Sequence, residues 1–276
     1  MRLWLTFLLV LIPSIAFAGI DFEGLNGGDY CVYNGSESDF DPSSSVSFAF
    51  WVYNPPGNDW TLIAKRDEST TGEAAFHLGI GVNWLGFYTD NPPTQNSGVQ
   101  WACQTSGATL PENQWHYVVV SFQWNGTATA CSGDFKVWIN GSSVSTTNWF
   151  GTGDFSPAPN TPENLYIGAM HDNGTTGDGI EEFDGILKNV AVWINHFFTD
   201  AEADFLYQGR FNALTPLQVA PNNLRALTLL PDVVEGINAD GKVFKNYAPG
   251  YADFTCYDGA NNTGLTSISD EHASYP

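Results

Sequence analysis

The sequence has few basic residues: nine Lys and Arg stand against 30 Asp and Glu in a chain of 276 residues. The formal net charge at pH 7 is therefore −21. Proteins bind the phosphates of nucleic acids and of anionic membranes through Lys and Arg, so this composition argues against both as partners. The excess of carboxylates leaves oxygen ligands available for a hard cation such as Ca²⁺.

The motifs of several enzyme classes are also missing. There is no G-x-S-x-G elbow, no phosphate-binding glycine loop and no H-E-x-x-H or H-x-x-x-H spacing. No C-x-x-C pair or Cys/His spacing indicates zinc. The histidines are scattered; they are His77, His116, His171, His196 and His272. These absences predict a protein that is not an enzyme.

One long apolar run is present, at the N-terminus. Arg2 precedes an apolar stretch from Leu3 to Ile15, and Ala16-Phe17-Ala18 stands before Gly19. This is the pattern of a secretory signal peptide, residues 1–18, with an A-x-A cleavage site. The run is too short to span a membrane comfortably. We therefore expect a secreted, extracellular protein that inserts in no membrane after cleavage.

The four cysteines all lie in the exported part. An even number of cysteines in an oxidising compartment favours two disulfides, and four cysteines allow three connectivities. We prefer Cys103–Cys131 and Cys31–Cys256. The first pair is close in sequence, and the second would connect the last strand to the first.

The middle of the chain predicts neighbouring β-strands. The run 115–124 is rich in Val and aromatic residues, as in a strand buried on both faces. After a polar insert, 135–139 alternates as in a strand with one face in a core, and Asn140-Gly141 predicts a tight turn. Elsewhere, short strands stand between turn residues, which favours a two-sheet antiparallel sandwich. Thr199 and Glu202 form a capping box that predicts one short helix ending near Gly209.

These segments resemble the laminin-G-like, concanavalin A-like lectin/glucanase jelly-roll superfamily. The matching motifs, in order, are Phe22 to Tyr30, Ser45 to Tyr53, Gln114-Trp115-His116, Val137 to Gly141, Leu165 to Gly168 and Phe183 to Trp193. The resemblance implies an all-β jelly roll over residues 19–209. The remaining residues, 210–276, are too few to bury a core of their own, so we expect a C-terminal extension packed on the same sandwich.

The resemblance also implies a structural Ca²⁺ at one rim, with Glu23, Asp29 and Asp184 as the first candidate ligands. A second acidic group precedes Asp184; it consists of Asp172, Asn173, Asp178, Glu181 and Glu182. Lys188 and Asn189 stand where the family has an acidic pair, which weakens the metal hypothesis. The alternative is a solvated acidic loop.

Glucanases share this fold and use an E-x-D-x-(x)-E strand, whose carboxylates lie close enough for a retaining mechanism. Glu182-Phe183-Asp184 is the nearest approach, but the residues that follow contain no second Glu. We therefore treat a glycosidase as the minor alternative.

Aromatic rings commonly bind sugars by stacking on their apolar faces. Trp51, Trp115 and Trp193 match core positions of the family, so Trp84, Trp101 and Trp149 are our candidates for a stacking platform. The alternative is that these rings fill the sandwich. The sequence thus predicts a secreted, non-catalytic module that binds a glycan or glycoprotein or serves adhesion at a cell surface. A rival hypothesis is a structural protein that self-associates into an extracellular assembly or fibre.

Overall fold

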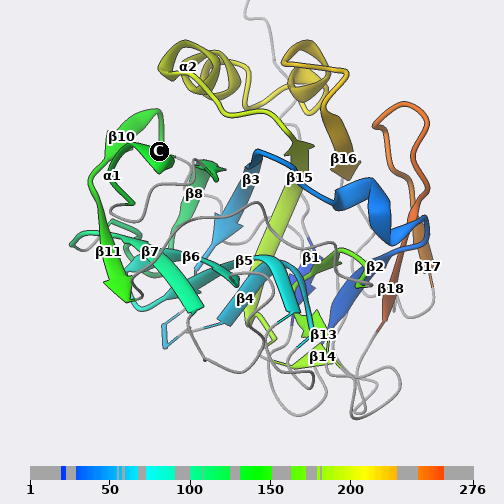
Figure 1. Ribbon diagram of the computed structural model, residues 1–276, viewed down its shortest axis with the longest axis horizontal. Coiled ribbons are helices and arrows are strands. Elements are labelled where there is room, and N and C mark those ends of the chain that lie inside the picture. Colours follow the sequence, from blue (N-terminus) through cyan, green and yellow to red (C-terminus); the bar gives the residue numbers. More distant parts are fainter. Residues whose placement is uncertain are drawn as a thin grey trace, which may run out of the picture.

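A computed structural model shows two β-sheets packed face to face (Figure 1). It describes residues 20–22, 29–54, 56–57, 60–67, 73–90, 100–107, 109–124, 131–150, 163–171, 179–180, 182–228 and 242–257. The predicted signal peptide, residues 1–18, lies outside this set. The all-β, two-sheet antiparallel sandwich expected from the sequence is confirmed.

The smaller sheet has seven strands in the described part of the chain, in the order β1-β15-β3-β8-β9-β10, with β16 also paired to β15. Their bounds are Ile20–Phe22 (β1), Gly185–Ile194 (β15), Ser45–Tyr53 (β3), Trp115–Gln123 (β8), Phe135–Ile139 (β9), Ser142–Val144 (β10) and Leu224–Thr228 (β16). All of these pairs are antiparallel.

The larger sheet has eleven described strands, in the order β11-β7-β6-β5-β4-β12-β2-β18-β17, with a β13–β14 hairpin beside β4. Their bounds are Thr146–Phe150 (β11), Gln100–Thr105 (β7), Trp84–Asp90 (β6), Glu73–Gly81 (β5), Trp60–Asp67 (β4), Tyr166–Ile167 (β12), Tyr30–Tyr33 (β2), Phe254–Tyr257 (β18), Lys242–Phe244 (β17), Met170–His171 (β13) and Gly179–Ile180 (β14). The short contact between β13 and β4 is parallel.

The predicted pair of central strands is present as β8 and β9. Val119 lies opposite Trp138, and the turn residues Asn140 and Gly141 have φ angles of 50° and 78°. Positive φ at both positions is what a two-residue hairpin turn requires. The last residues of the polar insert form one helical turn, α1 (Cys131–Asp134). The alternation was therefore sufficient to locate β9, and the Asn-Gly signal was sufficient to locate the turn that joins β9 to β10.

Strand β8 is buried on both faces, and each face belongs to a different core. Val118 and Phe122 enter the main core between the two sheets, whereas Tyr117 and Val119 enter a second core on the outer side of the seven-stranded sheet. The main core is lined by alternate residues of facing strands, as in other sandwiches. The continuous apolar run in the sequence has this physical origin.

The second core lies beneath helix α2 (Asp200–Gln208), which Figure 1 shows at the top of the view. It contains four buried tryptophans: Trp51, Trp115, Trp138 and Trp193. The predicted capping box is present, since Glu202 N–H donates to Thr199 Oγ1 over 3.2 Å and Thr199 N–H donates to Glu202 Oε2 over 2.8 Å.

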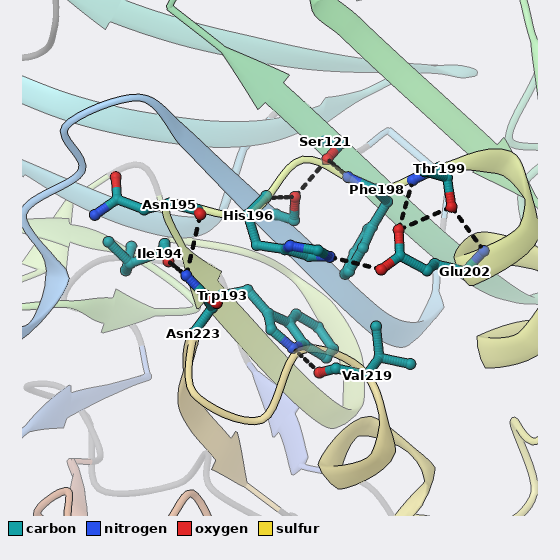
Figure 2. A network of polar contacts seen from close by, with 11 residues as sticks. Ser121, Trp193, Ile194, Asn195, His196, Phe198, Thr199, Glu202, Val219 and Asn223 are labelled. Carbon is teal, nitrogen blue, oxygen red and sulfur yellow. Dashed lines mark hydrogen bonds and ion pairs between the residues drawn. The ribbon is translucent and has the colours of Figure 1, made fainter.

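The segment between β15 and α2 is anchored by polar contacts (Figure 2). Phe198 N–H donates to Ser121 Oγ of β8 over 2.8 Å, and Trp193 Nε1–H donates to Val219 O over 2.7 Å. The carboxylate of Glu202 also lies 2.9 Å from His196 Nε2. These bonds hold the helix over one face of the seven-stranded sheet.

The structure contains both disulfides that the sequence predicted. Cys31 and Cys256 lie directly opposite each other on β2 and β18, and Cys103 of β7 is joined to Cys131 of α1. Strand β16 pairs with β15, and β18 pairs with β2. The strands described within 210–257 therefore belong to the same two sheets as the rest of the chain.

No helix within the described ranges has the length and apolar character needed to cross a membrane.

A buried lysine connects the eleven-stranded sheet to two loops. The Lys65 side chain is 0% exposed, and its Nζ lies 2.9 Å from Asp41 Oδ1. It also donates to the carbonyls of Glu37, in the 3₁₀ turn Glu37–Phe40, and of Glu163, over 2.9 and 2.7 Å. Burial lowers the pKa of Lys65, and the Asp41 carboxylate opposes that shift. Full pairing makes this buried charge tolerable.

Replacing Lys65 by Met should therefore lower the free energy of unfolding by about 3 kcal/mol, because the Asp41 carboxylate and two carbonyls lose their partner. Urea unfolding at pH 7 measures this change. Lys245→Met, at an exposed position next to β17, is the control and should alter stability by less than about 0.5 kcal/mol. Equal effects of the two substitutions would contradict the assignment.

Candidate functional site

The two sheets differ in what covers their outer faces. Within the described residues, α2 and the residues after it pack on the seven-stranded sheet, and α1 contacts β8, β9 and β11. No described helix packs on the outer face of β6, β5, β4, β12 and β2. Side chains that point to this outer face of the eleven-stranded sheet belong to neither of the two cores.

Strand alternation puts aromatic side chains on this face. Phe76 and Phe87 point into the main core, so their neighbours His77 and Tyr88 point outward. The two outward rings stack, with centroids 5.0 Å apart and planes 23° apart. The register then continues the row across the sheet: Tyr88 lies opposite His77, His77 opposite Ala64, and Ala64 opposite Tyr166.

A second group of rings extends the row on the far side of Tyr166. The ring of Tyr30 on β2 lies 5.8 Å from Tyr166 and 5.3 Å from Tyr257 on β18, measured between centroids. Tyr30 and Tyr166 face outward because their neighbours Cys31 and Ile167 belong to the main core. We call this set the aromatic face; it consists of Trp84, Tyr88, His77, Tyr166, Tyr30 and Tyr257.

Trp84 begins β6 and is held close to the sheet by two glycines. A Cβ atom at Gly81 or Gly86 would lie 2.2 or 2.6 Å from the indole ring, so only glycine permits this packing. The same Gly86 position lies 3.4 Å from the ring of Tyr88. Trp84 and Tyr88 therefore flank Gly86 on one strand, and both side chains are partly exposed.

A chain of polar contacts lies within the aromatic face. Arg66 of β4 has its Nη1 3.2 Å from His77 Nδ1, and His77 Nε2 lies 2.9 Å from Thr61 Oγ1. A guanidinium only donates, so Nδ1 must accept and the imidazole proton must sit on Nε2, which donates to Thr61. Burial and the neighbouring Arg66 charge together place the pKa of His77 well below its usual value. His77 is therefore a neutral ring that orients a cation.

A second neutral histidine lies at the central hairpin. His116 Nε2 donates to the carbonyl of Pro111 over 2.9 Å, and its Nδ1 lies 3.3 Å from the amide nitrogen of Asn140. The amide oxygen of Asn140 accepts the N–H of Tyr117 over 2.9 Å. Burial lowers the pKa of His116, and the bond to Pro111 opposes this shift. This histidine holds a turn together.

Of the three tryptophans expected to form a platform, only Trp84 has a described side chain. Trp101 lies on β7 opposite Thr89, and Trp149 lies on β11; their side chains are outside the described set. Thr89 is five residues along β6 from Trp84 (89 − 84), which is about 17 Å along a strand. The backbone positions of Trp84 and Trp101 are thus well separated along the sheet.

Sequence reasoning missed the tyrosines and Arg66 because it considered only tryptophan as a stacking residue. The signal was the alternation itself: the pairs Phe76-His77 and Phe87-Tyr88 each place one ring inward and one outward. The tryptophan at the end of β8, Trp124, fills the main core instead, and its Nε1 lies 3.3 Å from Thr89 Oγ1.

The chain segments that carry two of the expected calcium ligands meet at Gly168. A Cβ atom at Gly168 would touch the ring of Phe22 at 2.4 Å and the carbonyl of Asp29 at 3.2 Å. Phe183 N–H donates to the Gly168 carbonyl over 2.7 Å, and Asp184 follows it. Asp29 is buried and Asp184 exposed, and partial burial raises the pKa of the Asp184 carboxyl.

The third expected ligand, Glu23, lies outside the described residues, as do Asp172, Asn173, Asp178 and Glu181. Within the described ranges, no group of three or more His, Cys, Asp or Glu side chains could hold a metal ion. The metal site therefore stays a prediction that depends on residues beyond those described.

The residues of the glycosidase alternative lie before β15 rather than within it. Glu182 is partly buried and forms an isolated bridge with Thr61, and Asp184 is exposed on the other side of buried Phe183. Strand β15 itself, GILKNVAVWI, contains no carboxylate. A retaining glycosidase needs two carboxylates about 5–5.5 Å apart, and β15 supplies neither.

Comparisons with known proteins agree with this architecture. A family model described as the concanavalin A-like lectin/glucanases superfamily matches residues 25–202. No curated protein matches the chain in sequence. Among solved structures, a Bacteroides ovatus protein described as carbohydrate-binding has a TM-score of 0.53 and 19% identity over 92% of this chain and 60% of its own length. This chain thus spans less than two thirds of that protein.

Two further structures are more distant. The SAP-like pentraxin of Limulus polyphemus has 15% identity over 69% of this chain and 81% of its own, with a TM-score of 0.48. The CBM40 module of a Ruminococcus gnavus sialidase, bound to α2,3 sialyllactose, has 12% identity over 69% and 96%, with a TM-score of 0.44.

The two neutral histidines make stability depend on pH. Their pKa values are lowered on folding from an ordinary value of 6.5, so both are neutral in both states above that pH. Below pH 6.5 the unfolded chain binds protons that the folded chain refuses, and the free energy of unfolding falls by up to about 1.4 kcal/mol per pH unit for each histidine. Urea unfolding between pH 7.5 and 5 should show this loss.

His77→Gln and His116→Gln should each reduce the slope of unfolding free energy against pH by up to about 1.4 kcal/mol per pH unit, the contribution of one proton. If both variants keep the slope of the parent protein, other groups are responsible and the neutral assignment is wrong.

If Ca²⁺ binds near Asp29 and Asp184, the folded state alone binds it, and millimolar Ca²⁺ should raise the melting temperature relative to EDTA. Asp184→Asn should remove this difference, and Asp204→Asn, at an exposed position on α2, should leave it intact. Identical melting curves of the parent protein in EDTA and Ca²⁺ would mean that the acidic loop is solvated.

Proposed function

We propose that this chain, which belongs to the concanavalin A-like lectin/glucanases superfamily, is an exported, non-catalytic module that binds a glycan or glycoprotein through the aromatic face. Export rests on the predicted signal peptide, and the two disulfides agree with an oxidising compartment. The likeness to solved structures supports the fold, and the surface of this chain supports the choice of ligand.

The observation that carries the proposal is the register of the aromatic face. Partly or fully exposed rings from β6, β12 and β18 share one outer face, and the buried rings of His77 on β5 and Tyr30 on β2 pack against them. Sugars bind where aromatic rings meet their apolar faces while polar groups meet their hydroxyls. Arg66, which is partly exposed, supplies N–H donors beside His77. The surface thus offers both kinds of contact over several strands, which suits an extended glycan rather than a single sugar.

The described part of the same surface supports the proposal of a non-catalytic role. Thr61, His77 and Arg66 are the polar groups bonded to one another there, and His77 is used as a neutral acceptor for an arginine. Glycoside hydrolysis requires two carboxylates, and none of these three bonded groups is one. The paired carboxylates of the alternative, Glu182 and Asp184, precede a strand without acids.

The test is a glycan array with the purified protein, with and without Ca²⁺, followed by titration of the best ligand into variants. Tyr88→Ala and Trp84→Ala should each weaken binding about 10-fold or more, because base or sugar stacking on one ring is worth roughly 1–3 kcal/mol. Trp101→Ala and Trp149→Ala test the remaining candidates of the predicted platform. Phe205→Ala removes an aromatic side chain that is 45% exposed on α2, and it should leave affinity unchanged.

Equal weakening by Phe205→Ala would show that the site lies elsewhere. Circular dichroism checks that the variants fold. If Tyr88→Ala or Trp84→Ala does not fold, the ring in question is a core residue rather than a binding residue.

One observation favours self-association as a second candidate. Strand β17 is the last strand at one edge of the eleven-stranded sheet among the described residues, and its Val243 is 61% exposed. An exposed edge strand can pair with another chain. Light scattering decides this: a monomeric mass at micromolar concentration contradicts the structural role, and ordered fibres without glycan binding would replace the lectin-like role with it.

A further inference from the structure

Arg66 is a partly exposed cation on the outer face of the eleven-stranded sheet. Nine basic residues share the molecule with 30 acidic ones. In the part of the chain that the structure describes, ion pairs are formed by Lys65 and His196 with nearby carboxylates, and none is formed by Arg66. A partly exposed arginine in such an acidic protein would easily find a carboxylate if its role were to pair with one.

The backbone turns Arg66 away from its neighbour. The register of β4 against β5 shifts between Lys65 and Arg66. Lys65 is consequently enclosed by Asp41 and the two loop carbonyls, and Arg66 reaches the outer face, where it meets His77. The two adjacent basic residues thus lie in different surroundings: Lys65 is buried, and Arg66 is partly exposed on the outer face.

The partner of Arg66 positions the guanidinium without neutralising it. His77 uses Nδ1 to accept from Nη1 over 3.2 Å, and its own proton is used on Thr61. The ring is also stacked on Tyr88, which restricts its rotation. A guanidinium has five N–H donors, and this arrangement uses one of them. The remaining donors form a planar fork that matches a carboxylate or a sulfate.

We infer that Arg66 is the anion-recognition residue of the aromatic face, and that the glycan it binds carries a carboxylate or sulfate group. This inference rests on the proposed function, because it specifies the ligand of the same face. A glycan that lies along the aromatic face meets the partly exposed ring of Tyr88, and an acidic substituent of the same glycan reaches the partly exposed guanidinium of Arg66. The stacked ring and the charge together define a site for an acidic sugar.

The net charge of −21 does not forbid an anionic ligand. At physiological ionic strength the Debye length is about 8 Å, so exposed charges beyond that distance contribute little. A direct contact with a guanidinium on a partly enclosed surface is screened much less.

The experiment compares matched acidic and neutral glycans on the purified full chain. The probes are oligogalacturonate and its methyl ester, sialylated and asialo oligosaccharides, and sulfated and unsulfated galactan oligosaccharides, each measured by calorimetric titration. We expect at least one acidic member to bind about 10- to 100-fold more tightly than its neutral partner, which is the range for a hydrogen bond to a charged group. The pair that shows this preference distinguishes carboxylate from sulfate.

Arg66→Gln should lower the affinity for the acidic member by the same factor and leave the neutral partner unaffected. Arg66→Lys keeps the charge without the fork and should fall between the two. Arg225→Gln is the matched control, since Arg225 lies on β16 of the other sheet, where its guanidinium donates to Asn222 O over 2.8 Å and lies 5.0 Å from the ring of Tyr251. It should bind like the parent protein.

The outcomes separate this inference from the proposed function. Equal binding of acidic and neutral partners by the parent protein, with loss in Tyr88→Ala, overturns the anion inference and leaves glycan binding intact. The anion inference is also overturned if Arg66→Gln prefers the acidic glycan over its neutral partner by the same factor as the parent protein. Binding of no glycan on the array overturns both. If Arg66→Gln fails to fold, the comparison of acid with ester, which needs no variant, still decides the question.

Discussion

The burial of β8 on both faces is the constraint on which the rest of the structure depends. One set of its side chains, including Val118 and Phe122, closes the main core, and the other, including Tyr117 and Val119, supports α2. A strand with apolar residues on both sides must be covered on both sides. The seven-stranded sheet is therefore enclosed between the other sheet and the helical cover. In the described part of the molecule, this leaves the eleven-stranded sheet to present an outer face.

That face carries the rings of the aromatic face and Arg66, which forms no ion pair with any described residue. Its polar groups position one another: the bond to Thr61 fixes the tautomer of His77, and the bond to His77 fixes the direction of the Arg66 guanidinium. Lys65, the adjacent residue, shows the contrasting solution, in which a buried cation is matched by a carboxylate and two carbonyls. In an acidic protein, a cation held by a neutral ring keeps its full charge for a ligand, whereas a cation held by a carboxylate does not.

Much of this fold could be predicted from local patterns. The antiparallel pair of β8 and β9 followed from the run 115–124 and the alternation of 135–139, and the reversal from β9 to β10 followed from the Asn140-Gly141 turn, because hydrophobic period and positive φ are local properties. The capping box at Thr199 and Glu202 is local for the same reason. Both disulfides were also anticipated: four cysteines allow three connectivities, and the preferred one joined Cys103 to nearby Cys131 and the first strand to the last.

The candidate site could be predicted only in part. Trp84 was named, but Tyr88, Tyr166 and Arg66 were not, since nothing in their own segments says that they share a surface.

The sequence by itself determined the class of fold, the Asn140-Gly141 turn and the helix cap, because each depends on side-chain period or turn conformation along a short stretch. For the cysteines it left three pairings open, of which the preferred one is present. Only the tertiary structure decided which sheet is covered, which rings meet, and that Lys65 is enclosed while Arg66 is open. Those outcomes depend on strand order and register, since His77, Ala64 and Tyr166 become neighbours only when β5, β4 and β12 pair. Pairing of strands about 100 residues apart in sequence is set by the fit of the whole core, not by the residues of any one strand.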